Sequence, residues 1–243
     1  MNSSIASGGK AVYGAAIGVL MLEARFPRIP GDIGNAGTFP FPVLYKVVAG
    51  ASPDRVVLRR AEGLLNAFVD GARELVAMGA DGITTNCGFL SLFQGELASA
   101  CNVPVVTSSL MQAPFIERLL PPGQRVGILT VSAASLTSDH LEQAGVSPAT
   151  PIQGTDGGRE LTRVLLGDEE RLDVAAARHD VLAAGEALVQ RHPEVGAVLL
   201  ECTNMCPYAR ALRGHIGRPV FDMYNFIAWF QGALAPRSWD LPL

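Results

Sequence analysis

The stretches "ADGITTNC", residues 80–87, and "VGAVLLEC", residues 195–202, share one pattern, a short apolar run that ends in a cysteine. In each case a proline follows the cysteine by 17 residues (104 − 87 and 219 − 202), so the two segments match at a constant offset of 115 (202 − 87). The runs "AIGVLML", residues 16–22, and "RVGILTV", residues 125–131, are also alike. The sequence therefore predicts an internal duplication into two similar halves.

Between these landmarks, strand-like runs alternate with segments of helical periodicity, which is typical of parallel sheets with crossover helices. A long loop rich in Pro and Gly follows the first strand. We therefore expect an α/β protein with two pseudo-symmetric lobes, each a parallel sheet flanked by helices in a flavodoxin-like or Rossmann-like manner. The strands are expected at 12–22, 81–87, 103–107, 125–131, 150–153, 195–201 and 218–223, and the helices near 55–78, 90–101, 111–120, 134–144 and 168–191.

The segment "LLPPGQR", residues 119–125, breaks the chain between the two halves. It divides the sequence into an N-terminal lobe, residues 1–118, and a C-terminal lobe, residues 119–243, whose last segment can pack back on the first lobe. Ligands of open α/β sheets bind beyond the carboxyl ends of the strands. The active site is therefore expected in the cleft between the lobes, where equivalent strands of both halves end.

Composition excludes several classes of protein. With 49% hydrophobic and 17% charged residues the chain is globular, and a net charge of −4 without a Lys/Arg run predicts no nucleic-acid partner. The longest uncharged apolar run, residues 13–22, is half of the roughly 20 residues that a membrane helix needs. Glu23 and Arg25 follow it directly without a clear cleavage site, so a strand is favoured over a signal peptide. Four cysteines without a Cys-x-x-Cys motif predict reduced thiols and a cytoplasmic protein.

Both repeated cysteines are expected where a strand passes into a helix, beside free N–H groups and the positive helix end. Such a position stabilises thiolate and lowers the pKa of a cysteine below its usual value of about 8.5. Across two facing lobes, one thiolate can take a proton from a carbon atom and the other thiol can return one on the opposite face. Cys87 and Cys202 are therefore the candidate acid/base pair.

At these residues the sequence resembles the aspartate/glutamate/hydantoin racemase superfamily, over about residues 12–230. The resemblance implies two α/β lobes that each give one cysteine to a cofactor-independent racemisation. Glutamate racemases carry Cys-Asn-Thr and Cys-Thr-His at these places, whereas this chain has Cys-Gly-Phe at 87–89 and Cys-Thr-Asn at 202–204. The long loop "LEARFPRIPGDIGNAGTFPFP", residues 22–42, resembles a poorly characterised branch of the superfamily, so glutamate is not the expected substrate.

Polar residues at the ends of the expected strands are candidates for substrate binding, with helix capping as the alternative use. The resemblance implies a substrate-binding threonine after strand 125–131. Arg28 can hold a carboxylate with two parallel hydrogen bonds, although loop arginines are more often solvated. Glu201 is either a cap or a charge that raises the pKa of the neighbouring thiol. The candidate substrate-binding set is Asn86, Gly88, Thr107, Ser108, Thr130, Ser132, Thr203, Asn204 and Arg28.

These features predict a racemase or isomerase without a cofactor or metal, acting on a small amino acid, hydantoin, or related carboxylate or amide with an acidic C–H. A lyase or decarboxylase that forms a carbanion is the alternative on the same scaffold, and a cis–trans isomerase with a nucleophilic cysteine is a third. A binding protein without catalysis is the most remote alternative, because a binder has no need of two thiols. We expect a small-molecule partner, no nucleic acid and no membrane, and the chain is compatible with a homo-oligomer.

Overall fold

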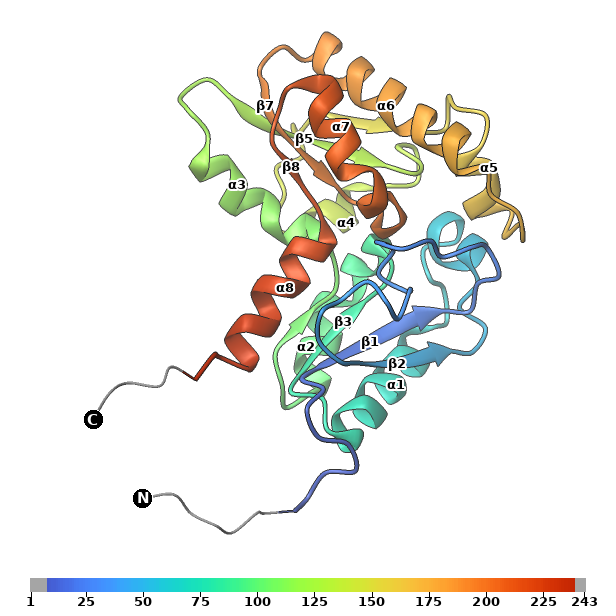
Figure 1. Cartoon of the computed structure of the whole chain (residues 1–243), viewed down its shortest axis with the longest axis vertical. Coiled ribbons are helices and arrows are strands. Elements are labelled where there is room, and N and C mark those ends of the chain that lie inside the picture. The colour runs from blue at the N-terminus through green and yellow to red at the C-terminus, as the bar shows by residue number, and fades with distance from the viewer. Residues whose placement is uncertain (1–7, 239–243) are drawn as a thin grey trace.

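The computed structural model describes residues 8–238 and contains two four-stranded parallel sheets, one in each lobe (Figure 1). The strand orders are β2-β1-β3-β4 and β6-β5-β7-β8, so β1 corresponds to β5 and β3 to β7. The expected fold of two similar α/β lobes is thereby confirmed. The outer ends of the expected lobes, residues 1–7 and 239–243, lie outside the described residues.

The first sheet is built from strands that are paired in parallel around β1. Helix α1 buries Phe68, Ala72 and Leu75 in the same core as Leu20 of β1. The elements of this lobe are β1 (Ile17–Leu22), β2 (Val43–Val48), the short π-helix η1 (Asp54–Leu58), α1 (Leu65–Met78), β3 (Gly82–Thr85), the 3-10 helix η2 (Gly88–Phe93), α2 (Gln94–Ala100), β4 (Val105–Val106), the 3-10 helix η3 (Ser109–Gln112) and α3 (Ala113–Leu119).

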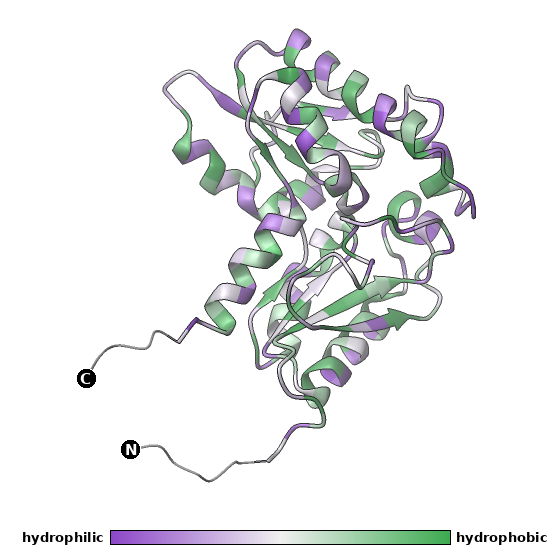
Figure 2. Ribbon diagram, in the orientation of Figure 1, coloured by the Kyte–Doolittle hydropathy of each residue, from purple (hydrophilic) through white to green (hydrophobic). Residues whose placement is uncertain are grey.

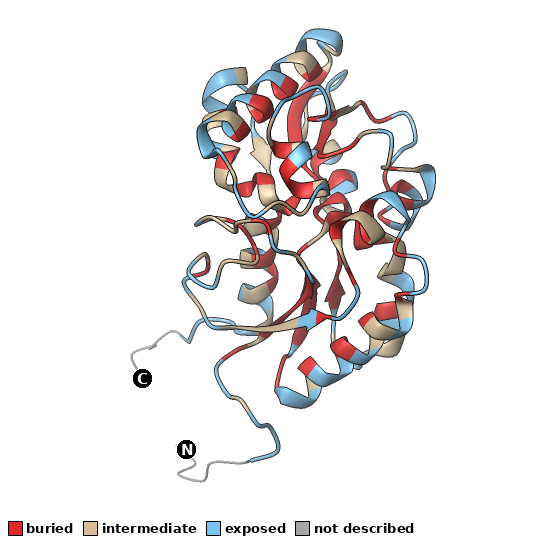
Figure 3. Cartoon of the chain, turned by 90° about the vertical axis from the view of Figure 1, so that its right-hand side faces the viewer, coloured by how far each residue is buried: buried red, intermediate tan, exposed pale blue. Residues whose placement is uncertain are grey.

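The second sheet repeats this plan around β5, and its central strand β7 is buried along its whole length. Its elements are β5 (Arg125–Thr130), α4 (Ser138–Gln143), β6 (Ile152–Gly154), α5 (Leu161–Leu166), α6 (Val174–Arg191), β7 (Val195–Leu200), the 3-10 helix η4 (Thr203–Tyr208), α7 (Ala209–Ile216), β8 (Val220–Phe221) and α8 (Met223–Leu234). The central strands are mainly apolar (Figure 2), and buried residues concentrate in the centres of the two sheets (Figure 3). Across the described residues no helix is both long and apolar enough to cross a bilayer.

Helix α8 leaves the second lobe and runs beside the first (Figure 1). Its buried residues Met223, Ile227 and Phe230 share a core cluster with Ile17 and Val19 of β1. This cluster lies apart from the one that holds α1, so α8 covers a second face of the first sheet. The close approach of helix to sheet depends on a missing side chain, because a methyl group at Gly82 of β3 would overlap Phe230 and Leu234.

Two expectations about local structure are wrong. The sequence 55–78 does not form one helix, because the backbone enters the left-handed region at Arg60, Ala61 and Gly63, with φ of 55°, 53° and 70°. These residues separate η1 from α1. The sequence also predicts no strand between the long loop and the expected helix, where the structure has β2 paired with β1 in parallel.

Candidate active site

The carboxyl ends of the central strands of both sheets meet at one small cavity of about 30 Å³. Strand ends of this kind are the usual ligand sites of α/β sheets. Most of the wall is apolar, and its polar groups are two thiols, one carboxyl group and three small polar side chains. The lining residues are Leu22, Phe26, Pro53, Val57, Asn86, Cys87, Gly88, Phe89, Val131, Leu165, Leu166, Glu201, Cys202, Thr203 and Asn204.

Cys87 lies between the end of β3 and the start of η2, where the chain is still extended (φ −149°, ψ 118°). Thr85 fixes this turn, because its hydroxyl donates to the carbonyl of Thr107 at 2.7 Å and its oxygen accepts the Cys87 N–H at 3.3 Å. The strand end therefore holds the thiol against the cavity, and Gly88 follows without a side chain.

Cys202 occupies the equivalent place between β7 and η4. Its Sγ–H donates to Oδ1 of Asn204 at 3.5 Å, and Cys87 and Cys202 are both free thiols. The thiols therefore approach one cavity from different lobes, and their charges interact closely enough for Cys87 to affect the pKa of Cys202.

The expectation that the thiol pKa values are lowered is wrong for this closed cavity. Burial, and after it the nearby charge of Glu201, raise the pKa of Cys87 to about 12, against an opposing effect of the Phe89 N–H and of Arg28. Burial and Glu201 also raise the pKa of Cys202 well above its ordinary value. At both sites a backbone N–H at the start of the following helix donates a hydrogen bond to the sulfur and lowers the thiol pKa. The loss of solvation on burial raises the pKa by more than this hydrogen bond lowers it.

Glu201 is fully buried between the two thiols and the end of β5. Its Oε2 accepts a hydrogen bond from the Thr130 hydroxyl at 2.6 Å, while its Oε1 has no hydrogen-bond partner. Burial raises the pKa of Glu201 to about 7, and the Thr130 hydrogen bond opposes that shift. Of the two uses expected for Glu201, the structure supports the charge that raises the thiol pKa.

A charged network from the long loop approaches the second thiol. Asp32 is buried and accepts from Arg28 Nη1 at 3.0 Å, from the Gly34 N–H at 2.7 Å and from Asn204 Nδ2 at 2.5 Å. The last of these bonds crosses between the lobes and orients the Asn204 amide, whose Oδ1 faces Cys202. Arg28 Nη2 is buried without a hydrogen-bond partner, and its guanidinium lies 4.7 Å from the centre of the Phe26 ring.

The predicted substrate-binding residues divide into two groups. Those that line the cavity with the two cysteines are Asn86, Gly88, Thr203 and Asn204. Those that do not line it are Arg28, Thr107, Ser108, Thr130 and Ser132. Most of the hydroxyls in the second group serve the fold, since Thr107 bonds Gln94 and Ser108 accepts the Leu110 N–H as a cap.

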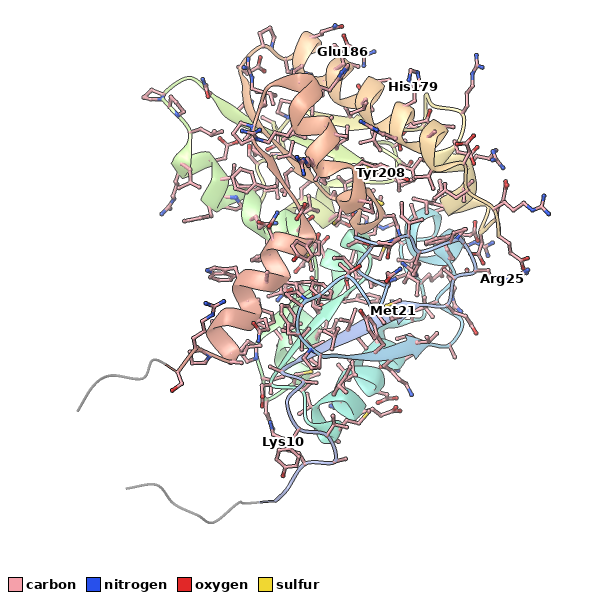
Figure 4. The ribbon with its side chains drawn as sticks, in the orientation of Figure 1. Lys10, Met21, Arg25, His179, Glu186 and Tyr208 are labelled. Carbon is pink, nitrogen blue, oxygen red and sulfur yellow. The ribbon has the colours of Figure 1, made fainter. Side chains whose placement is uncertain are left out.

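Two of the lining residues also hold the lobes together. The Thr203 hydroxyl donates to the carbonyl of Asn86 at 2.6 Å, and Asn86 Oδ1 accepts the Leu22 N–H at 2.8 Å. Arg25, at the outer edge of the junction (Figure 4), pairs with Glu170 of the second lobe. The bond between Thr203 and Asn86 links the two thiol-bearing turns, so the separation of the thiols depends on the contact between the lobes.

Sequence reasoning did not single out several residues of the site. Asp32 lies in the segment "GDIGNAG", whose glycines draw attention to the loop but not to its carboxylate. Phe26, Leu165 and Leu166 line the cavity from segments without a functional motif. No local signal identifies them, because their place at the cavity depends on how the lobes pack.

The family model described as Asp/Glu/Hydantoin racemase matches residues 67–230, about two thirds of the chain. The chain belongs to the Asp/Glu/hydantoin racemase family. The expected resemblance is thereby confirmed, and the matched region includes both cysteines.

Comparison with individual proteins adds two relatives and one structure. "Dimethylsulfoniopropionate lyase 7" of Emiliania huxleyi (strain CCMP1516) is 29% identical over 254 residues, covering 93% of this chain and 72% of the relative. "Dimethylsulfoniopropionate lyase 5" of the same organism is 29% identical over 229 residues, which are 90% of this chain but 45% of the relative. A crystal structure of arylmalonate decarboxylase has the same fold, with a TM-score of 0.59, 15% identity and coverage of 91% and 94% of the two chains.

Proposed function

We propose that the protein is a lyase that eliminates a neutral sulfide from a small carboxylate with a sulfonium group on its β carbon, as dimethylsulfoniopropionate has. The observation that carries the proposal is the thiol of Cys87 at the wall of one small, mostly apolar cavity. The names of the relatives supply the substrate class. Because the chain spans only part of those relatives, the substrate remains part of the proposal.

The elimination needs one base. A cysteine thiolate takes the proton from Cα, the C–H electron pair forms the Cα=Cβ double bond, and the Cβ–S bond breaks with its electrons on sulfur. The products are acrylate and dimethyl sulfide, and the proton remains on the cysteine until solvent removes it. The sulfide departs as a neutral molecule, so its departure requires no general acid.

Local charges favour Cys87 as this base. Arg28 lowers the pKa of Cys87, whereas Asp32 raises the pKa of Cys202. The Cys202 thiol also donates a hydrogen bond to Oδ1 of Asn204, which favours its neutral form. In this proposal Cys87 removes the proton, and Cys202 forms the opposite wall of the cavity.

Racemisation or another isomerisation is the second candidate, and the presence of a thiol from each lobe favours it. In that reaction one thiolate removes the proton and the other thiol returns a proton on the opposite face, so both are needed. The lyase needs one thiol and the racemase needs both, so the number of essential cysteines distinguishes the two proposed functions.

Proton NMR in D₂O tests the proposal. The protein is incubated with dimethylsulfoniopropionate and, separately, with a panel of amino acids, hydantoins and dicarboxylates. We expect acrylate and dimethyl sulfide from the sulfonium compound and no inversion in the panel. Exchange of an α proton with inversion in the panel, without elimination of the sulfonium compound, would establish the racemase instead.

A further inference from the structure

Glu201 presents an unpaired carboxylate oxygen inside the protein. The residue is fully buried, one oxygen has the Thr130 hydroxyl as its partner, and the other has none. Burying a carboxylate with so few partners opposes folding. No cation contributes to the pKa of Glu201, which is set by burial and by Thr130. A buried carboxylate without a cation beside it indicates that a bound ligand supplies the missing positive charge.

The wall around this carboxylate suits a cation that carries methyl groups. Gly88 leaves room for Oε1, since a methyl group at Gly88 would overlap that oxygen. The remaining wall is apolar and includes the aromatic side chains of Phe26 and Phe89. Aromatic faces and a nearby carboxylate are the surroundings that bind onium groups, whose charge is spread over their substituents.

We propose that Glu201 is the counter-ion that selects substrates with an onium group, either sulfonium or quaternary ammonium, on a small carboxylate. The inference rests on the proposed function for the carboxylate part of the substrate. Arg28 does not line the closed cavity, but its charge lowers the pKa of Cys87 and its Nη2 has no hydrogen-bond partner, so in this proposal it supplies the complementary charge when the lobes open. A zwitterion held between Arg28 and Glu201 places its acidic C–H beside the thiols.

The charge state of Glu201 makes this recognition depend on pH. The groups that face its carboxyl are the Thr130 hydroxyl at the end of β5 and the thiols of Cys87 and Cys202 before η2 and η4. In the closed, unliganded cavity burial raises the pKa values of both thiols, so neither adds a second negative charge there. Since burial raises the pKa of Glu201 to about 7, the affinity for a cation should increase as the pH rises through that value.

Binding measurements test this selectivity without turnover. Calorimetry compares β-(trimethylammonio)propionate, a cation with a poor leaving group, with its neutral isostere β-tert-butylpropionate. At about pH 8 we expect the wild-type protein to bind the cation at least roughly tenfold more tightly than the isostere. The ratio should fall towards one at about pH 6, where Glu201 is mostly protonated.

Two variants complete the test. Glu201→Gln should abolish the preference for the cation, and Glu194→Gln, which removes an exposed carboxylate just before β7, should retain it. Equal binding of both compounds by the wild type, or a preference that survives in Glu201→Gln, would overturn the inference. If Glu201→Gln does not fold, the pH dependence of the wild-type ratio decides. A clear preference for the cation without sulfide release would instead contradict the proposed lyase and leave this inference standing.

Discussion

At the scale of the residue, the charge on Glu201 opposes folding. Its pKa is about 7 in the folded chain against an ordinary value of 4.5. The folded protein therefore binds more protons than the unfolded chain between these values. The stability that follows from the raised pKa is fully present below about 4.5 and is lost as the pH rises through about 7.

Glu201→Gln should accordingly stabilise the protein at about pH 8, by up to about 3 kcal/mol, because the variant does not bury a charge. The gain should shrink as the pH falls towards about 5. Urea unfolding of both proteins across this range measures the difference, with Glu194→Gln as the exposed control. A variant less stable than wild type at every pH would show that Glu201 is held by attractive contacts instead.

At the scale of the element, the loop between β1 and β2 contacts the active site through the carboxylate of Asp32. This carboxylate accepts hydrogen bonds from Arg28, Gly34 and Asn204. The side chains of the Arg28–Asp32 ion pair are both largely buried. Asp32→Asn should destabilise the protein by about 3 kcal/mol, because it leaves the Arg28 charge without its partner. It should also lower activity, since the Asn204 amide beside Cys202 loses its orientation.

Chemical denaturation and initial rates check this prediction. Asp81→Asn is the matched control, because Asp81 pairs with Lys10 at an exposed site where an ion pair contributes less than about 1 kcal/mol. Equal effects of the two substitutions on stability and rate would mean that the loop network does not support the site.

The hydrophobic pattern of the sequence predicts the strongly apolar strands and the internal repeat. It does not predict the elements whose apolar pattern is interrupted. β3 and β7 are wholly buried, so their apolar runs end visibly at Cys87 and Cys202. β2 is only partly buried and lies in a segment rich in Pro and Gly, which hides its pairing with β1. The partner of Asp32 in the second lobe is 172 residues away, and such a contact leaves no local pattern.

At the scale of the whole molecule, closure of the two lobes controls access to the thiols. The cavity of about 30 Å³ is small for a substrate, so we expect the lobes to separate when one binds. We expect iodoacetamide to modify Cys101, which is partly exposed, before Cys202, which is buried. Mass spectrometry of the time course checks the order, and earlier modification of Cys202 would indicate an open cleft at rest.

The central claim is that one thiol of the pair is the base of an elimination. Its most direct test is the rate of acrylate formation from dimethylsulfoniopropionate by wild type, Cys87→Ser and Cys202→Ser. The account predicts a loss of at least about 100-fold for Cys87→Ser and a loss within about tenfold for Cys202→Ser, because elimination needs one base. Near-normal activity of Cys87→Ser, or an equally complete loss in both variants, would contradict it.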